Sequence, residues 1–192
     1  MTTEELNALK DRAYKTAVEH GFHKDAKPDA YYLGFVMSKM AKAIDADRKC
    51  LHANVKGFRV DATFGIDLNE RFEKSIKGSV EDGIAGIVIR LLYYAGTKGY
   101  KLHVVKEEAE ASSAAIIEMF AENGLSGTLF NLNGVLSDAL DENITDAAVS
   151  MIISVISSCF KKMTGSNYDL WWFVKQKMAY NELLPKLNGK KY

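Results

Sequence analysis

The 192-residue sequence contains few of the residues that mark secreted or metal-clustered proteins. It has two cysteines, Cys50 and Cys159, whose separation fits neither a disulfide framework nor a metal-ligand spacing. Isolated thiols are typical of a reducing compartment, and the charged N-terminus lacks the apolar stretch of a secretory signal. We therefore expect a cytoplasmic protein with unreactive thiols.

The sequence also lacks net charge, because 25 Lys and Arg residues balance 25 Asp and Glu residues. A neutral chain gives no bulk electrostatic reason to bind nucleic acid or an anionic membrane. The most apolar run, residues 147–160, is shorter than the about 20 residues that span a bilayer, so we interpret it as a buried helix. Neither nucleic acid nor a membrane is expected as a partner.

Proline is scarce too, since only Pro28 and Pro185 occur. Helical spacing of apolar residues predicts helices over residues 3–20, 29–49, 69–97, 104–123, 143–163 and 168–184. Residues 50–68 look irregular, and residues 124–142 are compatible with a short strand pair or a loop. No alternating strand pattern occurs elsewhere. The predicted fold class is therefore all-α, a helical bundle forming a single domain over residues 1–192.

Two of the predicted helices have apolar stripes that name candidate core residues. The stripe of the first helix consists of Leu6, Leu9, Ala13 and Ala17. The stripe of the second helix consists of Leu33, Val36, Met37, Met40 and Ile44. A faint similarity also links residues 80–89 with residues 144–153, and a duplicated helical hairpin and chance similarity of two buried helices both explain it.

Three segments carry a resemblance to a known family. They read HGFHKDAKPDAYYLGFVMSKMAKAIDADRK (residues 20–49), VEDGIAGIVIRLLYYAG (residues 80–96) and WWFVKQKMAYNELLPKLNGKKY (residues 171–192). In this order they resemble the first catalytic, second catalytic and closing segments of the MazG-like nucleoside triphosphate pyrophosphohydrolases. They cover about a third of the 192 residues, whereas residues 101–165 match only in length and helical character.

The resemblance implies an all-α fold, self-association as a dimer, and a defined chemistry. In the family, two facing helices each carry an acidic pair at i, i+3, which places both carboxylates on one helix face. Such oxygen ligands hold Mg²⁺ ions that clamp the triphosphate and help to generate the attacking hydroxide. The implied reaction cleaves between the α and β phosphates and yields a nucleoside monophosphate and pyrophosphate.

The four metal-ligand positions of the family are occupied here by other residues, namely Lys39, Lys42, Gly83 and Gly86. An ammonium has no lone pair to offer a metal ion, and glycine has no side chain at all. We therefore expect no metal cofactor and an inactive homologue. Because glycine costs a helix interior about 1 kcal/mol relative to alanine, the two glycines need a reason, and one reason is space for the lysine stems or for a ligand.

Several functions remain compatible with this pattern. Lys39 and Lys42 can replace the metal charge and bind a nucleotide or another phosphate-containing small molecule. Alternatively, the site has decayed and these lysines pair with acids or point into solvent, or the bundle serves a structural or assembly role. Hydrolysis would persist only through a shifted Mg²⁺ site, for which the candidate acids are Asp45, Glu81, Asp82, Glu118 and Glu122.

The closing segment offers further candidates for nucleotide or phosphate binding. These are Lys177, Asn181, Lys190 and Lys191, which match the segment that approaches the nucleotide in the family. A basic helix end that complements the helix dipole is the alternative. For His20 and His23 we favour a capping or packing role over a metal site, and for the aromatic cluster of Tyr168 and residues 171–173 we favour core packing over base stacking.

Overall fold

A computed structural model describes residues 1–22, 25, 27–104, 118, 122–141 and 144–189. Every regular element among these residues is a helix, which confirms the all-α class. The elements are α1 (Thr3–Glu19), α2 (Asp29–Arg48), α3 (Val55–Thr63), α4 (Leu68–Ser75), α5 (Val80–Lys98), α7 (Gly124–Asp141), α8 (Asp146–Thr164), α9 (Leu170–Leu183) and the 3₁₀-helix η2 (Lys186–Gly189). Most of the predicted helix over 104–123 lies outside the described residues.

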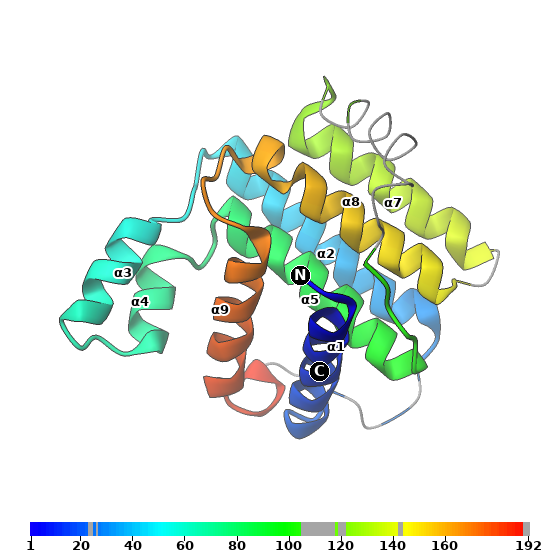
Figure 1. The fold of residues 1–192 in the computed structure, drawn as a ribbon, viewed down its shortest axis with the longest axis horizontal. Coiled ribbons are helices and arrows are strands. Elements are labelled where there is room, and N and C mark those ends of the chain that lie inside the picture. Colours follow the sequence, from blue (N-terminus) through cyan, green and yellow to red (C-terminus); the bar gives the residue numbers. More distant parts are fainter. Residues whose placement is uncertain (23–24, 26, 105–117, 119–121, 142–143, 190–192) are drawn as a thin grey trace.

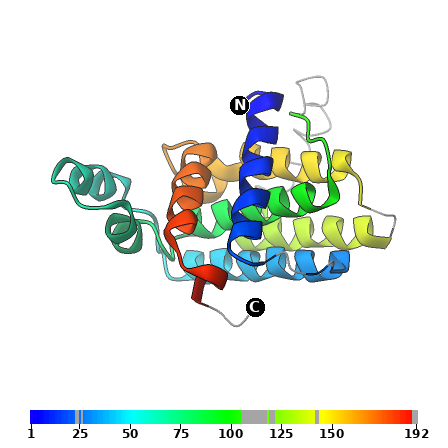
Figure 2. The ribbon, with the colours of Figure 1, turned by 90° about the horizontal axis from the view of Figure 1, so that it is seen from below.

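The helices form a layered bundle with one projecting pair. α2, α5, α7 and α8 run side by side along a common direction, and α1 and α9 lie across them (Figures 1 and 2). α3 and α4 pack on each other and project from one side of the bundle (Figure 1). α4 also contacts α9, so the projecting pair is joined to the helices that cross the bundle.

α5 is the central helix, with contacts to α1, α2, α8 and α9. It begins at Ser79, whose hydroxyl accepts a hydrogen bond from the Asp82 amide at 3.1 Å, and it ends at Gly99 in the left-handed region with φ 67°. Its fully buried residues include Ile84, Ile87, Val88, Leu91 and Leu92. A helix that is apolar on nearly every face belongs in a core, because each face must be covered by another element.

Two glycines set the distance between α5 and its neighbours. A Cβ at Gly83 would lie 2.8 Å from both Cα and Cβ of Ala43 on α2. A Cβ at Gly96 would lie 2.6 Å from Cβ of Tyr14 on α1. Both distances are too short for real carbon atoms, so α1 and α2 reach their positions only because α5 has no side chain at these points.

Three sequence predictions of local structure were wrong. The segment predicted to be irregular, residues 50–68, contains α3 and the start of α4, and the single helix predicted over residues 69–97 is two helices separated by a turn. The segment over residues 124–142 is α7 and not a strand pair or loop. Its buried stripe consists of Leu125, Leu129, Leu132 and Leu136. These leucines recur every three or four residues, a helical spacing that the intervening glycines and asparagines obscured.

The candidate core was largely correct. All four stripe residues of α1 are buried, as are Leu33, Val36 and Met40 of α2. Met37 was wrongly placed in the core, because 49% of its surface is exposed. The face of α2 that packs on α5 is instead continued by Ala43 and Ala46, whose small side chains permit the close approach at Gly83.

α8 contains the apolar run that the sequence placed in a buried helix. It has 19 residues and is long and apolar enough to cross a membrane by length and composition alone, and 50% of its apolar window is buried in the fold. Its buried residues face α5, α7 and α9. A core helix passes the same test of length and composition, so this is weak support for a membrane span.

The close contact at Gly83 predicts opposite effects for two glycine substitutions. Gly83→Ala should lower the free energy of unfolding by about 1–3 kcal/mol, because the new methyl group overlaps the α2 backbone. Gly34→Ala on α2 is the matched control, since a Cβ there meets nothing within 4 Å, and it should stabilise the protein by about 1 kcal/mol. Urea unfolding of both variants measures the difference, and equal effects would contradict the packing described above.

Candidate functional site

A pocket of about 860 Å³ lies between α1, α2, α5 and α9, next to the turn that joins α4 to α5. It brings together most of the residues that the sequence singled out, namely Lys39, Lys42, Asp45, Asp82, Gly83, Gly86, Lys177 and Asn181. Glu81 does not line it. The predicted binding residues Lys190 and Lys191 lie outside the described residues.

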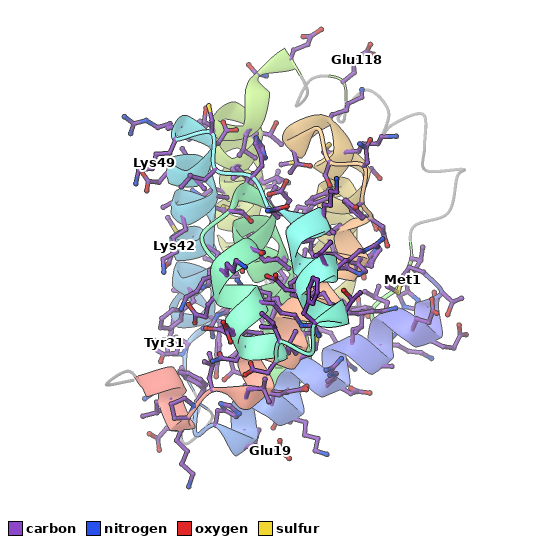
Figure 3. The ribbon with its side chains drawn as sticks, turned by 90° about the vertical axis from the view of Figure 1, so that its left-hand side faces the viewer. Met1, Glu19, Tyr31, Lys42, Lys49 and Glu118 are labelled. Carbon is purple, nitrogen blue, oxygen red and sulfur yellow. The ribbon has the colours of Figure 1, made fainter. Side chains whose placement is uncertain are left out.

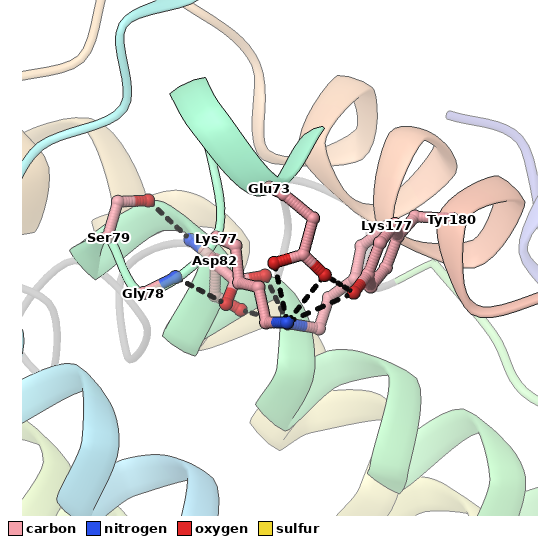
Figure 4. A network of polar contacts seen from close by, with 7 residues as sticks. All are labelled: Glu73, Lys77, Gly78, Ser79, Asp82, Lys177 and Tyr180. Atoms are coloured by element: carbon pink, nitrogen blue, oxygen red, sulfur yellow. Dashed lines mark hydrogen bonds and ion pairs between the residues drawn. The ribbon is translucent and has the colours of Figure 1, made fainter. Parts of the chain in front are cut away.

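Lys177 and Asp82 form a buried ion pair at the wall of this pocket. The Lys177 ammonium donates to the Asp82 carboxylate and, at 2.9 Å, to the Asp82 backbone carbonyl (Figure 4). The second carboxylate oxygen accepts a hydrogen bond from the Gly78 amide at 3.1 Å. The side chains of Lys177 and Asp82 are 10% and 13% exposed, so both charges depend on each other for compensation.

A second pair, Glu73 with Lys77, lies beside the first (Figure 4). The Lys77 ammonium donates to the two Glu73 carboxylate oxygens at 2.6 and 2.7 Å and to the Tyr180 hydroxyl at 3.2 Å. The Tyr180 hydroxyl in turn donates to Glu73. Hydrogen bonds from Lys77 and Tyr180 lower the pKa of Glu73, and the bond to Glu73 raises the pKa of Lys77. The Glu73 carboxylate is therefore already hydrogen-bonded to Lys77 and Tyr180.

The third pocket carboxylate, Asp45, is paired within its own helix. Lys49 donates to it at 2.6 Å across one turn of α2, and this hydrogen bond lowers the pKa of Asp45. Both side chains are more than half exposed, so the pair contributes little to stability. The pair matters for the charge of the pocket, because Lys49 and Asp45 neutralise each other there.

Three cations that line the pocket have no carboxylate within 4 Å among the described residues, and these are Lys39, Lys42 and Arg90. Lys42 is exposed, whereas Lys39 and Arg90 are partly buried. The Arg90 guanidinium lies over the rings of Phe22 and Phe35, 5.7 and 5.2 Å from their centroids. By formal charge, six Lys and Arg residues and three Asp and Glu residues line the pocket, an excess of three cations in a chain whose formal net charge is zero.

Lys39 shows the electrostatic cost of this excess. Burial lowers the pKa of its ammonium to about 7, helped by repulsion from Lys177, Arg90 and Lys42, while Asp82 acts in the opposite direction. An ordinary lysine has a pKa near 10.5, so the protein holds this group where its charge is poorly stabilised. A bound anion would supply the missing compensation.

The sequence suggested the same role for Gly83 and Gly86, but the two glycines have different neighbours. A Cβ at Gly86 would lie 3.1 Å from Lys39 Cδ and 3.4 Å from Lys177 Cε, so this glycine does leave room for lysine stems. Gly83 instead touches the backbone of α2 at Ala43. The suggestion that both glycines open space for lysines or ligand therefore holds for Gly86, whereas Gly83 serves the packing of α2 on α5.

The other acids proposed for a shifted metal site are dispersed. Glu81 is 3% exposed, accepts a hydrogen bond from the Ala53 amide at 2.9 Å and lies 3.2 Å from Nδ1 of His52. It therefore fixes the segment before α3. Glu118 and Glu122 are exposed and do not line the pocket, and Glu118 lies at the top of the view in Figure 3, apart from Lys42. Among the described residues, no three His, Cys, Asp or Glu side chains are grouped to hold a metal ion.

The remaining sequence candidates are structural or only partly described. Phe173 is buried, while Tyr168 and Trp172 lie against the Arg59 guanidinium, and none of them lines the pocket. His20 does line it, but His23 lies outside the described residues. Cys50 is exposed and Cys159 is buried, with burial raising the pKa of the Cys159 thiol.

Sequence reasoning missed Arg90 and the Glu73–Lys77–Tyr180 cluster. Arg90 follows Gly86 by four residues, so both lie on one face of α5, and this spacing was a signal that the sequence offered. Glu73 and Tyr180 are 107 residues apart and meet only because α4 contacts α9. No local sequence pattern predicts such a pair.

Removing the Lys39 charge should stabilise the protein in a pH-dependent way. Because the pKa of folded Lys39 lies below that of an unfolded lysine, the unfolded chain binds the proton more tightly between pH 7 and 10.5. The penalty is complete below pH 7 and disappears as the pH approaches 10.5. Lys39→Met should therefore raise the free energy of unfolding by about 1–3 kcal/mol at pH 6 and by much less at pH 10. A gain that does not change with pH, measured by urea unfolding, would refute this account.

Lys177→Met should have the opposite effect, because it leaves the Asp82 carboxylate buried without its cation. We expect a loss of about 3–5 kcal/mol in the free energy of unfolding. The double variant Lys177→Met with Asp82→Asn should recover part of this loss, since no charge is then left uncompensated. Strictly additive effects of the two substitutions would show that the ion pair does not couple α9 to α5.

Comparisons with known proteins identify no relative of this chain. No family model, no curated protein and no solved structure matches it. The function must therefore be argued from the residues and charges of the pocket.

Proposed function

We propose that this protein binds a small phosphorylated molecule, such as a nucleotide, in the pocket between α2, α5 and α9, and that it does so without a metal ion. The observation that carries the proposal is the charge excess described above, which comes from Lys39, Lys42 and Arg90. The three carboxylates of the pocket are already hydrogen-bonded to other lysines. An incoming anion would therefore meet unshared positive charge.

The side chains suit a phosphate in both chemistry and placement. A lysine ammonium binds phosphate as a point charge, and an arginine guanidinium can donate two parallel hydrogen bonds to its oxygens. A phosphate in the pocket would also relieve the repulsion among its cations. The volume of about 860 Å³ falls in the usual range for small-molecule sites.

We further propose that the chain is a divergent MazG-like protein in which lysines have replaced the catalytic carboxylates. In support, Lys39 and Lys42 on α2 line the same pocket as Gly83 and Gly86 on α5, as facing ligand pairs would. A duplicated hairpin agrees with α5 and α8, which each have 19 residues, follow a capping hydroxyl and contact each other. Dimer formation remains an expectation from the resemblance.

Thermal unfolding in EDTA tests metal-independent binding. Inorganic phosphate, pyrophosphate and ATP should raise the melting temperature in a concentration-dependent way, because a ligand that binds only the folded state adds about 2.7 kcal/mol at one hundred times its dissociation constant. Lys42→Met should reduce the shift, since it removes an exposed cation of the pocket and disturbs no packing. Lys15→Met is the matched control, because Lys15 is an exposed lysine on α1 that does not line the pocket.

Two results would contradict the proposal. One is the absence of any shift at millimolar anion, and the other is equal shifts in wild-type protein and Lys42→Met. Release of pyrophosphate from nucleoside triphosphates with Mg²⁺ or Mn²⁺ is measured in parallel. Metal-dependent turnover above the blank would favour an active enzyme over a binding protein.

A further inference from the structure

Lys39 differs from every other lysine that lines the pocket. Lys49, Lys77 and Lys177 each donate hydrogen bonds to a carboxylate. Lys42 is exposed to water. Lys39 alone among these described lysines is partly buried without a carboxylate partner.

The surroundings of Lys39 favour an amine that can react. Its stem lies against Gly86, so no side chain on α5 covers it at that point. Burial and neighbouring cations lower the pKa of its ammonium to about 7, so the neutral amine is more accessible near neutral pH than in an ordinary lysine. Burial and neighbouring cations are the known means of preparing a lysine for attack on carbonyl groups.

The cations around Lys39 determine which class of compound can bind next to its amine. Lys42 follows Lys39 by three residues on α2, and Arg90 follows Gly86 by four residues on α5. Both line the same pocket as Lys39, so both are placed to hold an anionic group beside it. The aromatic residues Phe22, Tyr93 and Tyr180 also line the pocket. This combination fits a molecule with a phosphate or carboxylate at one end and a carbonyl group a few bonds away.

We propose that Lys39 forms an imine with a small aldehyde or ketone that carries a phosphate or carboxylate group, and that Arg90 and Lys42 hold the anionic group. The inference rests on the proposed anion binding and adds a covalent step to it. It assigns the pocket a class of ligand, anionic carbonyl compounds, which simple phosphate binding does not specify.

The step is balanced without a metal ion, an oxidant or a reductant. The lone pair of the neutral Lys39 Nζ attacks the carbonyl carbon, a C–N bond forms, and the carbonyl π electrons move to oxygen. One proton passes from Nζ to that oxygen and gives a carbinolamine. A second proton from Nζ then leaves with the oxygen as water, and the C=N bond forms, so that one amine and one carbonyl compound give one imine and one water.

Pyridoxal 5′-phosphate is a suitable probe, because it joins an aldehyde, a phosphate and an aromatic ring. The protein is incubated with it at pH 7, reduced with borohydride to fix any imine, and digested for mass spectrometry. Lys39 should be labelled at least about tenfold faster than the exposed lysines, with a rate that rises around pH 7 and loses its advantage near pH 10. Inorganic phosphate should slow the labelling by competing for the same cations.

Two variants separate the imine from the binding of the anion. Lys39→Arg keeps a positive charge but cannot form an imine, so labelling at position 39 should be lost while phosphate still raises the melting temperature. Lys15→Arg, outside the pocket, should leave the labelling of Lys39 unchanged.

The possible failures are distinguishable. Labelling spread evenly over many lysines, or labelling of other lysines at an unchanged total rate in Lys39→Arg, would overturn the imine inference. If phosphate still shifted the melting temperature of the wild-type protein in that case, anion binding would stand. If phosphate neither shifted the melting temperature nor slowed the labelling, the proposed anion site would fail as well.

Discussion

The close contact of α2 with α5 at Ala43 and Gly83 is the constraint on which the rest of the structure depends. It fixes the spacing of the two helices that supply most of the pocket charge. One turn away along each helix, Lys39 lies against Gly86. Because the backbones already touch at Gly83, Lys39 cannot withdraw by a separation of the helices, and its ammonium stays at the pocket wall. The packing of α2 on α5 thus holds Lys39 where its charge is poorly stabilised, and a looser bundle would allow it to move away.

The pocket is electropositive through the distribution of its acids and not through an abundance of lysines. Asp45, Glu73 and Asp82 each have a lysine of their own, supplied by α2, by the segment after α4 and by α9. Each carboxylate that lines the pocket is therefore paired with one of these lysines. Lys39, Lys42 and Arg90 have no carboxylate partner among the described residues. A chain with no net charge can therefore carry a strongly charged site, and composition alone could not reveal it.

The sequence predicted those features that depend on local spacing. The apolar stripes located α1 and α2, and the apolar run of residues 147–160 located α8. The positions on α2 and α5 that the resemblance named do line one pocket. α7 was missed because glycine and asparagine weaken helix propensity, and its four buried leucines gain stability only from the helices that cover them. The pairing of Lys177 with Asp82 spans 95 residues and follows from the crossing of α9 over α5, which no local pattern encodes. The different roles of Gly83 and Gly86 could not be predicted from the sequence either, because they depend on which atoms of other helices lie next to each glycine.

Gly86 has a consequence for how selective the pocket can be. An alanine or larger residue there would press on the stem of Lys39, whereas glycine leaves the stem room to lie against α5. Ordering such a side chain on a ligand costs about 0.5–1.5 kcal/mol of conformational entropy. The three paired lysines are held by hydrogen bonds to carboxylates, whereas Lys39 has no carboxylate partner among the described residues. A ligand that contacted Lys39 would bear this ordering cost whatever its shape, so Lys39 would discriminate little among anions of different shape.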